Sequence, residues 1–148
     1  LEADIVIFAD ADWMDHLERA GFLEPASRAI LTANTLVLAT PADRPLDLAL
    51  EPGADLAGWL ARHPGGGRLA LADPDAVPAG RYARQALTWL GAWEDVESRA
   101  IRAEDVRAAL RFIASGEADA GVVYRTDART AGSAVHIVGT FPPDSHAP

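Results

Sequence analysis

The chain has 148 residues, of which 49% are hydrophobic and 24% are charged, which is ordinary for a globular protein and argues against disorder. Its formal net charge of −9 argues against nucleic acid or an anionic membrane surface as a partner, because both require a basic face. The lack of cysteine excludes a disulfide and a cysteine nucleophile, and no apolar run approaches the roughly 18 residues of a membrane helix. If the ligand is an anion, the chemistry of its site must overcome this acidic balance.

Apolar runs bounded by proline, glycine and asparagine alternate along the chain with segments of helical periodicity. Strand-like runs cover residues 5–8, 35–40, 68–72, 120–124 and 135–141, with 46–50 as a possible short strand. Helical patterns cover residues 13–21, 25–33, 55–63, 79–90 and 103–114. This alternation predicts an α/β fold with a mainly parallel sheet.

The signatures of catalysis and of metal binding are weak. The four histidines, His16, His63, His136 and His146, are not paired at the spacing of metal ligands, and solvated surface positions explain them better. No serine stands in a Gly-x-Ser-x-Gly elbow, and the glycines at 65–67 precede a strand, whereas those of a dinucleotide loop follow one. We therefore predict that the protein is not an enzyme and has no catalytic or metal-binding residue.

Three positions at strand ends or helix starts offer uncharged hydrogen-bond donors. In VPAGRYA, Pro78 opens a helix and Ala79 and Gly80 lack bulky side chains, so an oxyanion can approach the backbone N–H groups closely. In RAEDVRAAL, at the start of the helix predicted from residue 103, Glu104 and Asp105 can simply complement the helix dipole and Val106 can simply be core. In GVVYRTDA a strand ends at Tyr124, whose phenol needs a partner if it is buried. Each feature alone is more often structural, but together they favour a small-ligand site.

Longer segments of the chain carry a family resemblance. They read VIFADADWMDHLERAGFL, then ANTLVLATPAD, then GGGRLALADPDAVPAGRYARQALTWLGAWEDVESRAIRAEDVRAALRFIASGEADAGVVYRTDA, and finally HIVGTFPPDSH. From about residue 3 to the C-terminus the chain closely resembles the periplasmic molybdate-binding proteins of ABC transporters. The DP-x-x-VPAG-x-YA, AEDVR-AL and G-VY--DA blocks are specific in combination.

The resemblance implies a two-lobed, type II periplasmic binding-protein fold, truncated at both ends. Residues 3–40 would be part of the first lobe, 41–134 a nearly complete second lobe, and 135–148 a return crossing strand with a truncated C-terminus. The implied function is capture of molybdate or tungstate, without a cofactor, for delivery to a membrane permease. The implied location is periplasmic, with a signal segment that this chain does not contain.

The resemblance also implies ligand positions. The backbone N–H groups of Ala79 and Val106 and the hydroxyl of Tyr124 would donate to the oxyanion, and Pro78 and Gly80 would flank them. Two further ligands of the family are serines, one in an N-terminal segment that this chain lacks. The other belongs to a Ser-Ala-Asp that here reads Phe8-Ala9-Asp10, so that Phe8 or Ala9 would line the cleft without a hydroxyl.

Two other interpretations stay open at this point. The chain as it stands would have only a half-site and no tight binding if the missing serines are essential. It would be an effector-binding domain of the same fold if it belonged to a regulator, although no helix-turn-helix pattern or basic stripe is present. A truncated lobe would also expose apolar residues such as Ile5, Val6 and Ile7, and we expect such a chain to self-associate.

Overall fold

The computed structural model describes residues 3–8, 11–63 and 66–147. The chain divides into two compact units, one ending at Ala33 and the other spanning Asn34–Ala147. Among the described residues, no helix is both long and apolar enough to span a membrane.

The described part of the first unit contains one helix, α1 (Ala11–Arg19), which confirms the helix predicted there. The strand predicted at residues 5–8 is wrong, because these residues form no ladder. A single extended segment needs a partner strand, and none pairs with residues 3–8 within the described ranges. The helix predicted at residues 25–33 is also wrong: the chain turns at Ala26, whose φ of 63° is left-handed, and then runs on without helical bonding.

Polar contacts and exposed apolar side chains characterise this first unit. Arg28 forms ion pairs with Asp15 at 2.6 Å and Glu18 at 2.7 Å, and hydrogen bonds to Glu18 and Asp15 raise the pKa of its guanidinium. Every large hydrophobic side chain that is exposed among the described residues belongs to this unit: Ile5, Ile7, Phe8, Trp13, Phe22, Ile30 and Leu31. None of the described residues in this unit is buried.

The second unit is built on a five-stranded sheet with the order β3-β2-β4-β1-β5. The strands are β1 (Leu36–Pro41), β2 (Leu69–Ala72), β3 (Ala100–Ala103), β4 (Ala120–Tyr124) and β5 (Val135–Thr140). β2 is parallel to β3 and β4, whereas β1 is antiparallel to β4 and β5. Four strands thus run in one direction and β1 opposes them, so the sheet is mixed.

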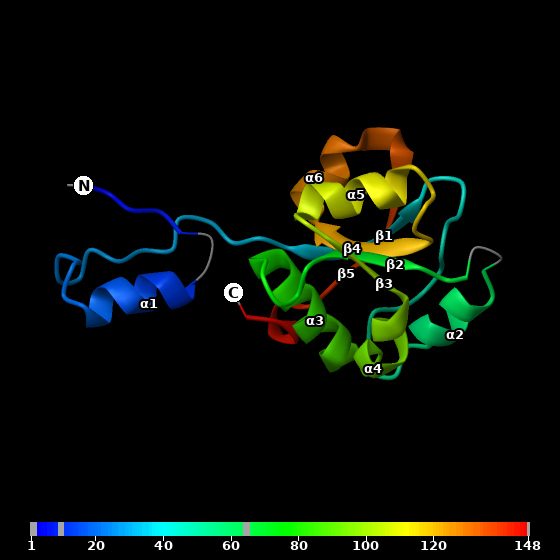
Figure 1. Cartoon of the computed structure of the whole chain (residues 1–148), viewed down its shortest axis with the longest axis horizontal. Coiled ribbons are helices and arrows are strands. Elements are labelled where there is room, and N and C mark those ends of the chain that lie inside the picture. The colour runs from blue at the N-terminus through cyan, green and yellow to red at the C-terminus, as the bar shows by residue number, and fades with distance from the viewer. Residues whose placement is uncertain (1–2, 9–10, 64–65, 148) are drawn as a thin grey trace. The chain divides into compact units, whose positions relative to one another are not determined.

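Helices cover both faces of this sheet (Figure 1). The helices α2 (Leu56–Ala61), α3 (Pro78–Leu90) and α4 (Trp93–Val96) cover one face, and α5 (Val106–Ala114) and α6 (Arg125–Thr130) cover the other. Short 3₁₀ turns lie at Glu97–Arg99, Gly132–Ala134 and Pro143–Ser145. Successive side chains of β1 point to opposite faces of the sheet, so the strand contributes to the core on each side. Leu36 and Leu38 belong to the first core cluster, and Val37 and Ala39 belong to the second.

The predicted elements of this unit are largely confirmed, with four differences, of which the first is that helix α4 was not predicted. Strand β3 was not predicted, and it displaces the start of the following helix from residue 103 to Val106. The possible strand at residues 46–50 does not form; its alternation instead reflects Leu46, Leu48 and Leu50 packing on the first core cluster. Helix α6 was not predicted because its sequence RTDART is polar, with only Ala128 buried.

Candidate oxyanion-binding site

The topology of the second unit brings three of the predicted site residues to one edge of the sheet. β2, β3 and β4 are parallel, so their carboxyl ends meet at the same edge. The chain then enters α3 after β2, α5 after β3, and α6 directly after Tyr124 of β4. The N–H of Asp73, just after β2, donates to the carbonyl of Ala103 at the end of β3 at 2.8 Å. This bond ties the first two strand ends together.

Helix α3 begins without a side-chain cap. Val77 is the N-cap residue in extended conformation, and Pro78 occupies the first helical position. The N–H groups of Gly80 and Arg81 both donate to the Val77 carbonyl at 3.0 Å. The N–H of Ala79 has no acceptor among the residues that the structure describes. The start of this 13-residue helix therefore presents an unused donor at the positive end of its dipole.

Gly80 has a structural explanation that needs no ligand. A Cβ at this position would collide with the carbonyl oxygen of Ala72 and with the backbone of Asp73. The helix thus packs directly on the end of β2, and only glycine allows this close approach. The role of Gly80 and of the half-buried Pro78 as cleft-lining residues stays a prediction.

Helix α5 begins with a side-chain cap. Asp105 is extended, with φ −156° and ψ 174°, and its Oδ1 accepts from the N–H of Ala108 at 2.7 Å. The carbonyl of Asp105 accepts from the N–H of Ala109 at 3.1 Å. Val106 follows as the first helical residue, and its N–H finds no acceptor in the described ranges. Its half-buried side chain packs on the second core cluster, so the valine also has the core role that its sequence allowed.

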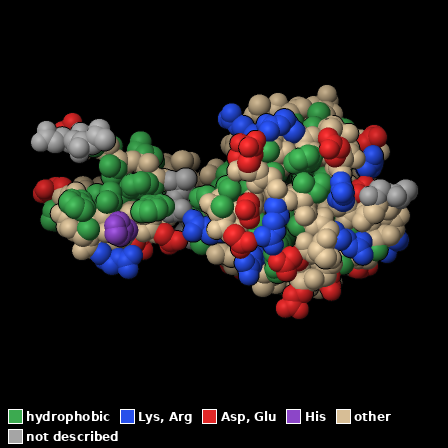
Figure 2. All heavy atoms as spheres, viewed as in Figure 1, with side chains coloured by type: hydrophobic (Ala, Val, Ile, Leu, Met, Phe, Trp, Pro, Cys, Tyr) green, Lys and Arg blue, Asp and Glu red, His purple; other side chains and the backbone are tan. Residues whose placement is uncertain are grey.

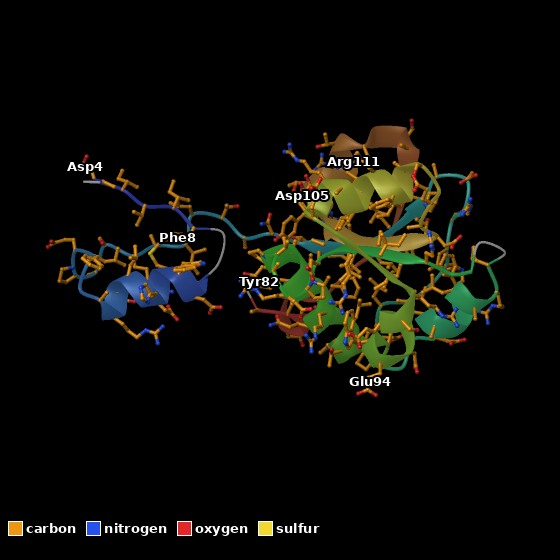
Figure 3. All side chains as sticks on the ribbon, viewed as in Figure 1. Asp4, Phe8, Tyr82, Glu94, Asp105 and Arg111 are labelled. Atoms are coloured by element: carbon orange, nitrogen blue, oxygen red, sulfur yellow. The ribbon has the colours of Figure 1, made fainter. Side chains whose placement is uncertain are left out.

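Tyr124 completes this edge from the next strand. It ends β4 in register with Leu36 of β1, and the N–H of Arg125 donates to the carbonyl of Thr35 at 2.8 Å. The half-buried ring packs against the core cluster on the α3 side of the sheet. Figure 3 shows Asp105 at the start of α5 and Tyr82 in α3 toward the same end of this unit.

Two of the predicted cleft-lining residues, Phe8 and Ala9, belong to the first unit. Phe8 is 38% exposed and lies outside any strand, so it has no ladder to orient it. Ala9 lies outside the described residues. Their role as cleft-lining residues stays a prediction.

Sequence reasoning missed a charge cluster beside this edge. Arg102 of β3 lies 2.7 Å from Asp75, 3.2 Å from Glu97 and 3.8 Å from Asp73, measured between guanidinium and carboxylate atoms. Acidic and basic side chains are likewise interspersed over the visible face of this unit in Figure 2. The sequence shows the pair of aspartates in DPDAVPAG, but nothing in it identifies Arg102 as their partner.

The histidines make ordinary structural contacts. His63 stacks on Trp59 with ring centroids 4.0 Å apart, and His146 lies 5.9 Å from Tyr82. Within the described part of the chain, no three His, Asp or Glu side chains are grouped so as to hold a metal ion.

The structure resembles solved oxyanion-binding proteins. The Azotobacter vinelandii periplasmic molybdate-binding protein matches with a TM-score of 0.61 and 29% identity, over 95% of this chain and 58% of that one. A Clostridium difficile substrate-binding domain, assigned to a molybdenum ABC transporter, matches with a TM-score of 0.73 and 26% identity, over 95% and 57%. A two-component signal-transduction protein shares the fold alone, with a TM-score of 0.55 and 23% identity.

Sequence relatives point the same way. The molybdate-binding protein ModA of Escherichia coli K12 is 41% identical over 145 residues, which is 97% of this chain and 54% of that protein. ModA of Haemophilus influenzae is 37% identical over 147 residues, 99% of this chain and 56% of that protein. The chain thus spans slightly more than half the length of these relatives. The sequence profile of the bacterial extracellular solute-binding proteins matches residues 1–148, and the chain belongs to this family.

Proposed function

We propose that this protein is the substrate-binding component of an ABC transporter and captures molybdate or tungstate. One observation carries the proposal. Two helix N-termini lie at the same edge of the sheet as the strand end at Tyr124, and the N–H groups of Ala79 and Val106 in these helices have no acceptor among the described residues. The names of the relatives that are 41% and 37% identical support molybdate as the ligand.

The proposed chemistry needs no cation. Two N–H groups at the positive ends of helix dipoles and one phenol offer hydrogen bonds to a tetrahedral dianion, and their desolvation strengthens each bond. An acidic protein can therefore hold an anion, provided that these donors are fixed in advance. Selection against sulfate would rest on cavity size, because sulfate has the same charge and shape.

We assign the two-lobed division of the family to this chain as part of the proposal. Residues 41–134 would form the second lobe, 3–40 part of the first, and 135–148 the return crossing segment. In this division the donors described above belong to the second lobe, and closure of the lobes would remove the bound ion from water. The compactness of the unit Asn34–Ala147 supports a lobe that holds its own donors in place.

The remaining parts of the proposal concern location and partners. A periplasmic or other extracytoplasmic location and a membrane permease as recipient follow from the transport role. Nucleic acid is not a partner, in keeping with the net charge of −9, and the protein has neither a catalytic reaction nor a resident cofactor.

Titration calorimetry of the 148-residue chain tests the function. Molybdate, tungstate, sulfate and phosphate are titrated separately under the same buffer and salt. Tight binding of the first two anions alone is the expected result and would show that the missing serines are dispensable. Heat from none of the four would favour the interpretation of the chain as a half-site without tight binding.

We also propose that this chain associates with itself. Ile5 and Ile7, at 80% and 73% exposure, and Phe22, Ile30 and Leu31 leave an apolar surface on residues 3–33 that lacks a core to cover it. Figure 2 shows hydrophobic side chains gathered on the visible face of this unit. Sedimentation equilibrium across a hundredfold range of concentration measures the association, and a monomer throughout would contradict it.

A further inference from the structure

Two aspartates stand directly before the helix that presents the Ala79 donor. Asp73 and Asp75 lie in the loop from β2 to α3, and the Asp73 side chain accepts from the N–H of Asp75 at 3.1 Å. The carbonyl of Asp73 accepts from the N–H of Val77, the N-cap residue, at 2.9 Å. The position of the helix start thus depends on the conformation of Asp73. Two carboxylates this close in sequence to an anion site would oppose the anion unless they are neutralised.

Positive charge reaches these aspartates from two elements: Nη1 of Arg84 in α3 lies 3.6 Å from Oδ1 of Asp75, and Arg102 of the neighbouring strand contacts both carboxylates. Nη1 of Arg102 lies 2.7 Å from Oδ2 of Asp75 and 3.8 Å from Oδ1 of Asp73, and Nη2 lies 3.2 Å from Oε1 of Glu97. The guanidinium therefore joins the loop after β2 to the turn that precedes β3. Its planar fork allows two carboxylates to be engaged at once, which a lysine ammonium does less well.

Arg102 is also placed to couple the two backbone donors. The next residue, Ala103, accepts the hydrogen bond from the N–H of Asp73, and Val106 follows three residues later. The side chain of Arg102 thus holds the loop that leads to Ala79, and its backbone leads to Val106. Because the arginine is 40% exposed, its ion pairs add little to overall stability. These ion pairs act mainly on the conformation and charge of the loop before α3.

We propose that Arg102 is a positioning residue of the oxyanion site: it fixes the Asp73–Val77 loop against the end of β3 and offsets part of the loop's negative charge. The inference rests on the proposed oxyanion-binding function. It accounts for how carboxylates beside an anion site can repel the anion less than their own charge would, in a chain with a net charge of −9.

Four variants of the chain, titrated with molybdate by calorimetry, test this role. Arg102→Gln keeps most of the side-chain stem and removes the charge, and we expect it to weaken binding on the order of tenfold. Arg102→Lys keeps the charge and should lose less than half of that effect on a logarithmic scale. Arg62→Gln is the matched control, because Arg62 is an exposed arginine of a surface pair with Asp55 at 3.7 Å, and its affinity should stay within twofold of the wild type.

The decisive variant is the double substitution Arg102→Gln with Asp75→Asn. If Arg102 balances charge at the site, removing the opposing carboxylate should restore at least threefold of the lost affinity. A merely structural contact would not be restored by deleting its second partner. Urea unfolding midpoints of all variants confirm that each one is folded.

The outcomes separate this inference from the proposed function. A wild-type chain that binds no molybdate contradicts ligand capture by this chain and favours the half-site interpretation, and the role of Arg102 falls with it. Wild-type binding with an unchanged Arg102→Gln variant, an equal loss in Arg62→Gln, or no recovery in the double variant overturns the inference alone.

Discussion

The backbone N–H of Val106 can be removed with little disturbance to the fold. Proline is favoured at the first position of a helix, where the N–H has no intrahelical partner, and Val106 occupies this position in α5. The residue before it, Asp105, is already extended, with φ −156° and ψ 174°, close to the conformation that proline requires of its predecessor. Val106→Pro therefore deletes the donor and keeps the helix.

The expected loss follows from the value of one hydrogen bond. A bond to a charged group contributes about 1.5–3 kcal/mol, which corresponds to about 10- to 150-fold in affinity. Val106→Ala is the control, since it shortens the same half-buried side chain and keeps the N–H. We expect calorimetry with molybdate to give a large loss for the proline variant and a change of less than threefold for the alanine variant.

Stability has to be measured beside affinity. Both variants lose contacts with the second core cluster, so their unfolding free energies should fall by similar amounts, about 1 kcal/mol. If Val106→Pro binds as tightly as Val106→Ala while both remain folded, this N–H is not a ligand donor. The carry-over of the site from the family would then be wrong at this position.

Two further predictions address other residues. Tyr124→Phe should weaken molybdate binding by about tenfold, the scale of one lost hydrogen bond, whereas Tyr82→Phe in nearby α3 should leave it unchanged; equal affinities of wild type and Tyr124→Phe would remove Tyr124 from the site. Thr40 is fully buried in β1, and its hydroxyl has no partner among the described residues, so Thr40→Val should raise the free energy of unfolding by about 1 kcal/mol in urea titrations. Thr40→Ser, which keeps the hydroxyl and loses a methyl group, should be less stable than the wild type, and a destabilised valine variant would mean that the hydroxyl is satisfied.

Local sequence patterns were sufficient to predict helix α3 and the buried strands of the sheet. Helix α3 has Pro78 at its start and Gly91 in left-handed conformation, with φ 81°, at its end, so both boundaries were marked in the sequence. The buried strands β2 and β4 are short apolar runs between turn residues, and they lie at the centre of the sheet. Composition and periodicity describe such elements well, because burial determines them.

The sequence does not show which segments form edge strands or which segments pair with one another. β3 is an edge strand with an exposed arginine, so its four residues carry no apolar run. Residues 5–8 do carry one, yet they form no strand, because a ladder depends on a second segment and not on the run itself. The direction of β1 was equally hidden, since pairing direction depends on the path of the chain between strands.

The residues of the candidate site also differ in how far the structure explains them. Ala79 and Val106 were predicted as donors from family motifs, and capping geometry gives them a physical basis, because each N–H stands in a first helical turn where no backbone acceptor exists. Gly80 lies in the same motif, but its packing on β2 already explains it. A motif residue can therefore be retained for the ligand, for the fold or for both, and only the contacts distinguish these cases.

The acidic composition now has a more specific meaning than it had in the sequence. Net charge acts over long distances and is screened, whereas an ion in the proposed site would respond mainly to the nearest groups. Around the loop before α3, those groups are the carboxylates of Asp73, Asp75 and Glu97, each within 3.8 Å of the Arg102 guanidinium, and Arg84, which lies 3.6 Å from Asp75. The affinity for an anion should depend on the balance within this cluster far more than on the total of −9. For this reason, Arg102→Gln and Arg62→Gln, which change the net charge equally, are expected to differ in binding.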